Sequence, residues 1–285
     1  MNNDKYLQII KKCINNMPSL PLGVNKIKNV CYDPKSSPID IYKLIILDPV
    51  LIAKVIKLFN SVYYGVSGKV TSLVKIIITL GINTVKNIVI NSSDINKLNI
   101  KDSLSSDNAG TFWRHSFCTA VAAKIFALKT GKDYNEAEEY FMAGMLHDIG
   151  KIPILACFPS QYNAIADNSK EALIDMEQKV FGFDHCFIGK MITKQWAIGE
   201  KMEAVVSDHH DPKPATESKY KEIINMVSIA DYFINKIGFG FFGTQAIPSD
   251  VLFKSTGITE DMFKDAEKTI LSELEKAKIF LDLKG

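Results

Sequence analysis

The residues of this chain that are best able to do chemistry are its five histidines, and all of them fall within the stretch 111–231. His147 directly precedes Asp148, and His210 directly precedes Asp211. Imidazole and carboxylate groups together bind hard or borderline divalent metal ions, and one carboxylate can bridge two of them. The residue types and their pairing therefore predict a metal centre, which makes 111–231 the chemical half of the protein.

The order of the candidate ligands suits two cations that share one bridging carboxylate, which is predicted to be Asp148. The predicted ligands are His115, His147, Asp148, His185, His209, His210 and Asp231. His115 and Asp231 would complete the site of the first cation. His185 and His209, with His210 close by, would bind the second. We expect about two divalent transition-metal ions (iron, manganese, zinc or nickel), in the two-metal arrangement that suits phosphoester hydrolysis.

Lys151 is predicted to meet a phosphate, because it follows the His147-Asp148 pair by about one helical turn. Asp148 and Lys151 are thus the predicted catalytic residues. Each candidate also has a plainer interpretation when taken alone. A single histidine on an apolar helix is usually a hydrogen-bonded core residue, and a single lysine usually lies at the surface. The complete set, spread over four or five predicted helices, favours the metal centre.

Composition and charge limit the classes of function. The 285 residues are 47% hydrophobic and 23% charged, with no membrane-spanning apolar run and no signal-like N-terminus, so we expect a cytoplasmic protein without a membrane partner.

Residues 1–101 carry a net charge of +9 (14 lysines, 5 acidic residues), whereas 102–285 carry −7 (20 basic, 27 acidic residues). Arg114 is the only arginine, which argues against nucleic-acid binding because base and phosphate readers favour the guanidinium fork. The five cysteines contain no CxxC pair and predict free thiols.

Helix signals fill the first hundred residues. Ser37, Pro38 and Asp40 form a predicted helix start, with serine at the N-cap and proline at the first helical position. Helices are predicted at 38–47, 49–64 and 72–80. Residues 84–90 are rich in β-branched side chains, which favour a strand, but their helical neighbours and the lack of a pairing partner favour a helix. The polar stretch 94–110 is the predicted linker.

The rest of the chain also predicts helices alone, and hence an all-α protein. They are expected at 111–130, 135–148, 171–182, 184–196, 199–210 and 219–237, and another follows Thr259. The helix that carries His147 is expected to stop at Gly150–Pro153. The stretch Gly238–Gly243, with three glycines among three phenylalanines, is predicted to be a flexible loop. It would serve either as a lid or docking patch at the metal cavity, or as a plug of the core.

Several longer motifs resemble a known family. LHDIGK, with His115 upstream and ADYF downstream, is similar to the HD superfamily of metal-dependent phosphohydrolases. The segments MPSLPLGVNKI, ILDPVLIAKVIKLFNSVYYG, FWRHS, FGFDHCFIGKMITKQWAI and VVSDHHDPK resemble more specifically the HDOD family, the HD-related output domain. This resemblance covers most of the chain, from residue 17 to about residue 245.

The resemblance implies an N-terminal helical bundle, residues 1–101, packed on an HD-like helical domain with a C-terminal helix, residues 102–285. It also implies a role in bacterial signal transduction, because such proteins generally act as output or scaffolding modules. A signalling protein would then be the partner, and a nucleotide or a phosphate group would be a ligand. On this basis we expect a regulatory HDOD protein with a metal-loaded HD site.

The ligand set and Lys151 are also similar to the HD-GYP cyclic-dinucleotide phosphodiesterases. An active phosphohydrolase or phosphodiesterase, acting on a nucleotide or cyclic dinucleotide, is therefore the alternative. The chain departs from that pattern in two places. The letters DPKPATE follow His209-His210 without a GYP motif, and Thr111 stands where some trinuclear members have an acidic ligand.

Overall fold

The structure, a computed structural model of the chain, describes residues 3–15, 17, 29–62, 73–92, 106–166, 171–211, 218–241 and 250–280. Helices make up the regular structure of these ranges, and no strand occurs in them. The predicted all-α fold is thus confirmed. Among the described helices, none combines the length and the hydropathy that crossing a membrane requires.

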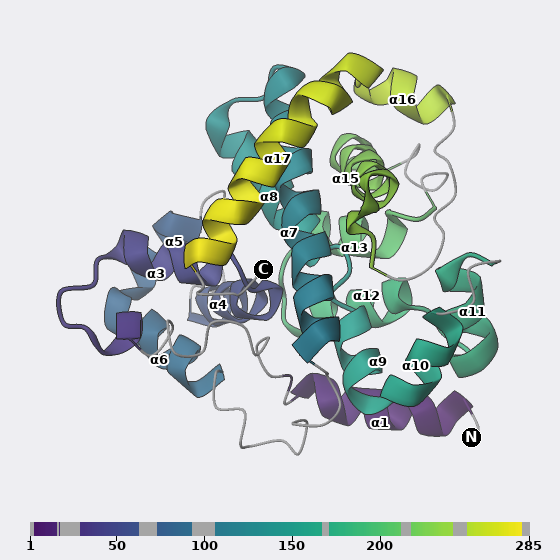
Figure 1. Cartoon of the computed structure of the whole chain (residues 1–285). Helices are drawn as coiled ribbons and strands as arrows, with labels where there is room; N and C mark the ends of the chain where they lie inside the picture. Colours follow the sequence, from purple (N-terminus) through teal and green to yellow (C-terminus); the bar gives the residue numbers. More distant parts are fainter. Residues whose placement is uncertain are drawn as a thin grey trace.

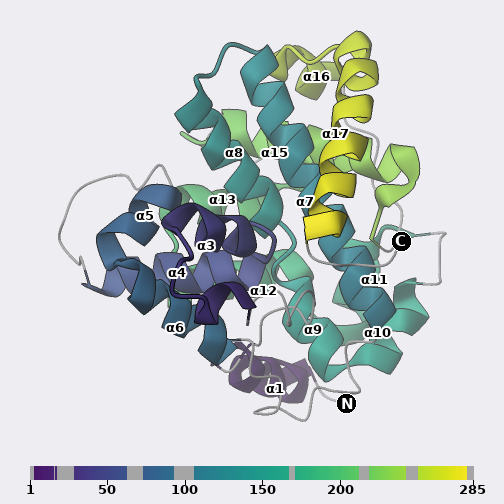
Figure 2. The same cartoon turned by 60° about the vertical axis from the view of Figure 1, so that its left-hand side comes forward.

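Four helices of the first half form a small bundle, which lies to one side of the longer helices in Figures 1 and 2. They are α3 (Pro38–Ile45), α4 (Pro49–Val62), α5 (Leu73–Leu80) and α6 (Ile82–Ser92). Three of them match the predicted helices at 38–47, 49–64 and 72–80. The fourth contains the β-branched stretch 84–90, so the prediction of a helix there is confirmed. Val85 and Val89, one turn apart, are fully buried in the bundle.

The helix starts follow from local hydrogen bonds. The Ser37 hydroxyl oxygen accepts a hydrogen bond from the Asp40 backbone N–H, and the Asp40 carboxylate accepts one from the Ser37 backbone N–H at 2.9 Å, a reciprocal capping box. Asp48 caps α4 in a similar way, because its carboxylate accepts from the backbone N–H groups of Val50 and Leu51. Both starts agree with the sequence prediction.

The second half is built around one long helix, α7 (Ser106–Lys129), which packs against α8, α15 and α17 and runs through the middle of Figure 1. Its other elements are α8 (Tyr134–Leu146), α9 (Lys151–Cys157), α10 (Pro159–Ala166), α11 (Leu173–Phe181), α12 (His185–Gln195), α13 (Glu200–Asp208), α15 (Lys221–Ile234), the π-helix η3 (Asn235–Phe239), α16 (Asp250–Thr256) and α17 (Glu260–Phe280). The predicted helices of this half are all present.

The first helix of the chain, α1 (Asn3–Asn15), packs against α9 of the second half. Tyr6 of α1 stands edge-on to two aromatic rings there, Phe158 at 4.8 Å and Phe181 at 5.3 Å between centroids. The chain thus crosses between its two halves before the bundle begins. The predicted boundary between residues 101 and 102 stays a prediction.

Two local predictions need correction, those of the linker and of the loop. Residues 106–110 of the predicted linker belong to the first turns of α7, and 94–105 lie outside the described residues. α8 ends at Leu146, ahead of the predicted stop at Gly150–Pro153, and α9, which the sequence did not predict, begins at Lys151. Pro153 falls in the first turn of α9, where its missing N–H costs no helical hydrogen bond.

The predicted loop at Gly238–Gly243 is helical in its first part. Gly238 and Phe239 belong to η3, which ends a long helical stretch with Gly238 in the left-handed region at φ 86°. That conformation suits glycine and gives a physical reason for the kink. Phe242 and Gly243 lie outside the described residues.

Candidate metal centre

Five separate segments bring the predicted ligands to one place inside the second half. His115 comes from the middle of α7, His147-Asp148 from the turn after α8, and His185 from the first position of α12. His209-His210 follow α13, and Asp231 comes from α15. Six of these side chains are at most 2% exposed, and His210 is half-buried. Such complete burial is unusual for ionisable groups and demands compensating charge.

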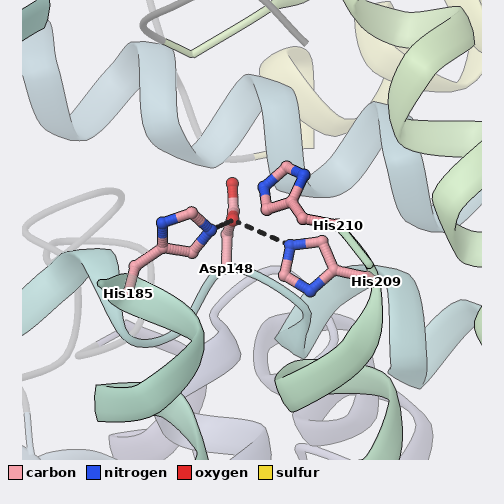
Figure 3. A group of neighbouring side chains, drawn as sticks. All are labelled: Asp148, His185, His209 and His210. Carbon is pink, nitrogen blue, oxygen red and sulfur yellow. Dashed lines mark ion pairs between the residues drawn. The ribbon is translucent and has the colours of Figure 1, made fainter. Parts of the chain in front are cut away.

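The Asp148 carboxylate lies at the centre, with its two oxygens facing different histidines. Its Oδ2 atom is 3.3 Å from Nε2 of His115 and 3.3 Å from Nε2 of His147. Its Oδ1 atom is 3.3 Å from Nε2 of His185 and 3.5 Å from Nε2 of His209, the pairs joined by dashed lines in Figure 3. This is the geometry of a carboxylate that can bridge two cations.

The two histidines that face Oδ2 form a first group with Asp148, and the two that face Oδ1 form a second group with it. Asp231 and His210 extend these two groups. Oδ1 of Asp231 is 3.2 Å from Nε2 of His115 and 3.8 Å from Nε2 of His147, so Asp231 joins the first group. The His210 ring lies 5.0 Å from the His185 ring and 4.2 Å from the His209 ring. Within the second group of four residues, one ligand atom of each lies within 4.8 Å of the others.

The outer nitrogen of each central histidine is held by an acceptor, which sets the tautomer. These contacts are His115 Nδ1 to the Phe239 carbonyl at 3.1 Å, His147 Nδ1 to the Gly144 carbonyl at 2.7 Å, His185 Nδ1 to the Glu177 carboxylate at 2.6 Å, and His209 Nδ1 to the Val206 carbonyl at 3.2 Å. Because these acceptors can only accept, each Nδ1 carries the proton. When such an imidazole gives up a proton from Nε2, that nitrogen directs a lone pair toward Asp148, as a metal ligand would.

The oxygen and nitrogen atoms that point into the centre of the cluster require a positive charge between them. Asp148 Oδ1, His185 Nε2 and His209 Nε2 are buried without a hydrogen-bond partner among the described residues. Burial by itself lowers the pKa of His115, but hydrogen bonds to Asp148 and Asp231 outweigh it and raise that pKa to about 9. The cluster therefore attracts either protons or cations, and its nitrogen and oxygen donors fit a divalent transition metal.

Lys151 lies inside the molecule and not at the surface, which contradicts the plainer interpretation of this residue. Its Nζ atom is 2.6 Å from Asp148 Oδ2, and the side chain is only 4% exposed. The same ammonium group stands 5.8 Å above the ring of Phe241. Phe241 is buried and stacks edge-on against Phe112 of α7. One side of the cluster is thus closed by an aromatic ring.

Sequence reasoning missed Glu177, which supports His185 from behind. Its fully buried carboxylate accepts hydrogen bonds from His185 Nδ1 at 2.6 Å, from the His185 backbone N–H at 2.9 Å and from the Tyr162 hydroxyl at 2.7 Å. A signal was available, since Glu177 stands one turn from both Leu173 and Phe181, the two apolar residues that α11 buries. A glutamate on the inner face of an amphipathic helix requires a partner.

Two glycines allow the ligand-bearing segments to approach closely. A Cβ atom on Gly144 of α8 would lie 2.6 Å from the Ala120 Cα of α7, so the two helices meet with no side chain between them. A Cβ atom on Gly150 would lie 1.9 Å from the His185 carbonyl oxygen. Glycine at both positions is therefore part of what brings His147-Asp148 to the other ligands.

The model of the HDOD domain family matches residues 17–212. An uncharacterized protein of Treponema pallidum (strain Nichols) is 23% identical over 265 residues, which cover 92% of this chain and 50% of that protein. The chain thus spans about half the length of the curated relative it matches.

Solved structures share the fold. A response regulator of Methylococcus capsulatus, MmoQ, is 18% identical with a TM-score of 0.65 and covers 88% of this chain and 98% of its own. A virulence factor of Campylobacter jejuni is 20% identical with a TM-score of 0.63 over 92% of each chain. An HDOD domain protein of unknown function from Geobacter sulfurreducens is 25% identical with a TM-score of 0.50 over 98% of this chain and 97% of its own.

Proposed function

Because the chain belongs to the HDOD domain family, we propose that it is a signal-transduction module whose buried histidine and aspartate cluster binds two divalent cations. One observation carries this proposal. The two oxygens of Asp148 each face a separate pair of histidine nitrogens, and Oδ1 has no hydrogen-bond partner among the described residues. A carboxylate in that position suits a bridge between two metal ions.

The first cation would be held by His115, His147, Asp148 and Asp231, and the second by Asp148, His185, His209 and His210. Iron, manganese, zinc and nickel all fit a donor set of imidazole and carboxylate. Bound cations would polarise a phosphate ligand and neutralise its charge. The protein's own contribution is to orient the imidazoles through their Nδ1 hydrogen bonds and to exclude water.

Burial favours a regulatory role for the cations over turnover. The ligands other than His210 are at most 2% exposed, and the Phe241 ring lies over Lys151. A cation in such a closed site would stabilise the fold or sense metal availability. MmoQ, which shares the fold, is a response regulator. We extend the proposal to a signalling protein as partner and to the cytoplasm as location.

The alternative is a metal-dependent phosphohydrolase, and the position of Lys151 is what favours it. Its buried ammonium group stands 2.6 Å from Asp148, where it would neutralise charge on a phosphate bound beside the cations. In that case Asp148 would hold both cations and Lys151 would bind the substrate. The substrate would be a nucleotide or a cyclic dinucleotide, and the Phe241 side chain would have to move to admit it.

Metal analysis of the full chain tests the proposal. Protein purified without chelator should contain about two equivalents of Fe, Mn, Zn, Ni or Co, or should take them up on reconstitution. A chain without any of these metals before and after reconstitution contradicts the proposal. The loaded protein is then assayed against a panel of phosphodiesters and nucleotides. Turnover that is lost in Lys151→Ala would favour the phosphohydrolase over the regulatory module.

A further inference from the structure

The first half of the chain contacts three successive residues at the end of α12 and in the turn that joins it to α13 (Trp196–Gly199). Asn15 of α1 accepts a hydrogen bond from the Gln195 side chain at 2.5 Å. The ammonium group of Lys57, from α4, stands 5.2 Å above the Trp196 ring. Asn60, one turn further along α4, donates a hydrogen bond from its side chain to the carbonyl oxygen of Ala197.

The backbone of this turn has an unusual conformation. The Ala197 and Ile198 N–H groups donate to the carbonyls of Lys194 and Thr193, which is the Schellman ending of a helix. Such an ending places its central residue in the left-handed region, where glycine is usual. Ala197 adopts φ 50° instead, and no other non-glycine residue in the described ranges has a positive φ. A strained conformation of this kind persists only when surrounding contacts hold it.

The helices on both sides of this turn carry the ligands of the second cation. α12 begins with His185, and α13 is followed directly by His209-His210. The two helices pack tightly, since a Cβ atom on Gly189 would lie 2.3 Å from a methyl carbon of Val206. An eleven-residue helix is roughly 16 Å long, so a shift of the turn is passed along a stiff helix pair to the ligand end.

The turn also has room to move. A cleft of about 260 Å³ lies between the two halves of the chain. Ile198 and Gly199 line it on the side of the turn, and Ile56 and Asn60 line it on the side of α4. A tightly packed turn could not shift without creating voids, whereas this one borders existing space.

We propose that the first half of the chain controls the second cation site by holding the α12–α13 turn. When the contacts of Asn15, Lys57 and Asn60 with this region are lost, α12 and α13 can shift. The shift misaligns His185 and His209-His210 and so weakens binding of the second cation. Linkage makes the effect reciprocal, so binding of that cation strengthens the contacts between α4 and the turn. The inference rests on the proposed function, because it names how the same site is regulated.

The test uses the full chain with Asn60→Ala and with the pair Asn15→Ala and Asn60→Ala. Mn²⁺ is titrated into metal-free protein by calorimetry, and hydrogen exchange is followed by mass spectrometry. We expect the second binding step to weaken about five- to tenfold, within the usual range of coupling between sites, while the first step stays unchanged. Exchange of the α12–α13 turn should quicken in metal-free variants. Loading with Mn²⁺ should slow exchange in α4 of the wild-type protein but not in the variants.

Tyr42→Phe is the matched control, because Tyr42 of α3 donates a hydrogen bond to Glu138 of α8 at 3.0 Å and thus joins the two halves away from the turn. This variant should leave the second step unchanged. Equal weakening of both steps in Asn60→Ala, or no change in either step, overturns the inference and leaves the proposed function intact. A wild-type chain that binds no cation contradicts the proposed function itself.

Discussion

Asp148 and the residues that touch it decide the chemistry at the scale of single residues. A fully buried carboxylate among four imidazoles and one ammonium group is held ionised: burial by itself raises its pKa, but the neighbouring His147 and Lys151 lower it well below its usual range. The carboxylate is therefore available to cations at any physiological pH. Its loss removes the carboxylate that pairs with the buried Nζ of Lys151 and Nε2 of His209.

Asp148→Ala should reduce the metal content from about two equivalents to nearly none, because both cations share this ligand. Lys151→Ala should retain most of the metal, since an ammonium group does not bind cations. Elemental analysis of both variants checks this, with circular dichroism to confirm that each variant is helical. Equal metal losses in the two variants would mean that Lys151 has been given the wrong role.

Glu177→Gln should weaken the second cation about 10- to 100-fold, the usual effect of removing an outer-shell partner of a histidine ligand. The carboxylate holds the Nδ1 proton of His185 and strengthens the electron donation of Nε2. Tyr162→Phe removes only the hydroxyl bonded to Glu177 and should have a smaller effect. Competition with a chelating dye measures both affinities. If Tyr162→Phe weakens binding as much as Glu177→Gln, the carboxylate charge is not the cause.

At the scale of elements, helix ends and the segments beside them position the site. The end of α12 is strained at Ala197, whereas Gly182 ends α11 at φ 79° without strain. Phe241, two residues after the end of η3, closes the cluster on the side of Lys151. These short segments decide how the long helices meet, and they are the places where single substitutions should have the largest effect on stability.

Ala197→Gly should raise the free energy of unfolding by about 1 kcal/mol, because glycine adopts a positive φ without the clash of a Cβ atom. Urea denaturation of the full chain measures the change. Ala204→Gly, inside α13, is the comparison and should lower stability by about 1 kcal/mol through the poor helix propensity of glycine. A loss of stability in both variants would show that Ala197 is not strained.

Phe241→Ala should lower the free energy of unfolding by about 3–5 kcal/mol, the usual cost of removing a buried aromatic ring. Its ring is 1% exposed and packs on Phe112 at 5.2 Å, which favours the plug over the lid among the two sequence interpretations. Metal affinity should change little. A stable variant with altered cation or ligand affinity would favour the lid instead.

At the scale of the whole molecule, the first half of the chain is packed into the second at several places. α1 packs on α9, α4 contacts α8, and α4 also holds the α12–α13 turn. These contacts include the aromatic cluster of Tyr6, Phe158 and Phe181. The apolar surface that they cover would face water if the first half were removed.

A chain that begins at Asp107 should therefore be poorly soluble or should unfold at a clearly lower temperature than the full chain. It lacks α1 and the bundle, which together cover α8, α9 and the turn after α12. Thermal unfolding followed by circular dichroism compares the two chains. A soluble chain with the same midpoint as the full protein would show that the two halves are independent.

The amino-acid sequence by itself determined the helical class, most of the helix positions and the set of residues in the cluster. Those features depend on neighbours in the chain. Ser37 and Asp40 cap a helix through contacts three residues apart. The histidines and aspartates were selected by residue type and order alone. Pro153 shows the limit of such signals, since proline breaks a helix at an interior position but is tolerated in the first turn, where it stands in the unpredicted helix α9.

Only the tertiary structure decided which histidines face which oxygen of Asp148, that Glu177 supports His185, and that Lys151 lies inside. It also revealed that α4 is hydrogen-bonded to a strained turn at Ala197. Each of these features depends on the angles and distances at which helices far apart in sequence pack together. Periodicity defines the buried face of a helix, but the partner of that face depends on close packing across the whole molecule.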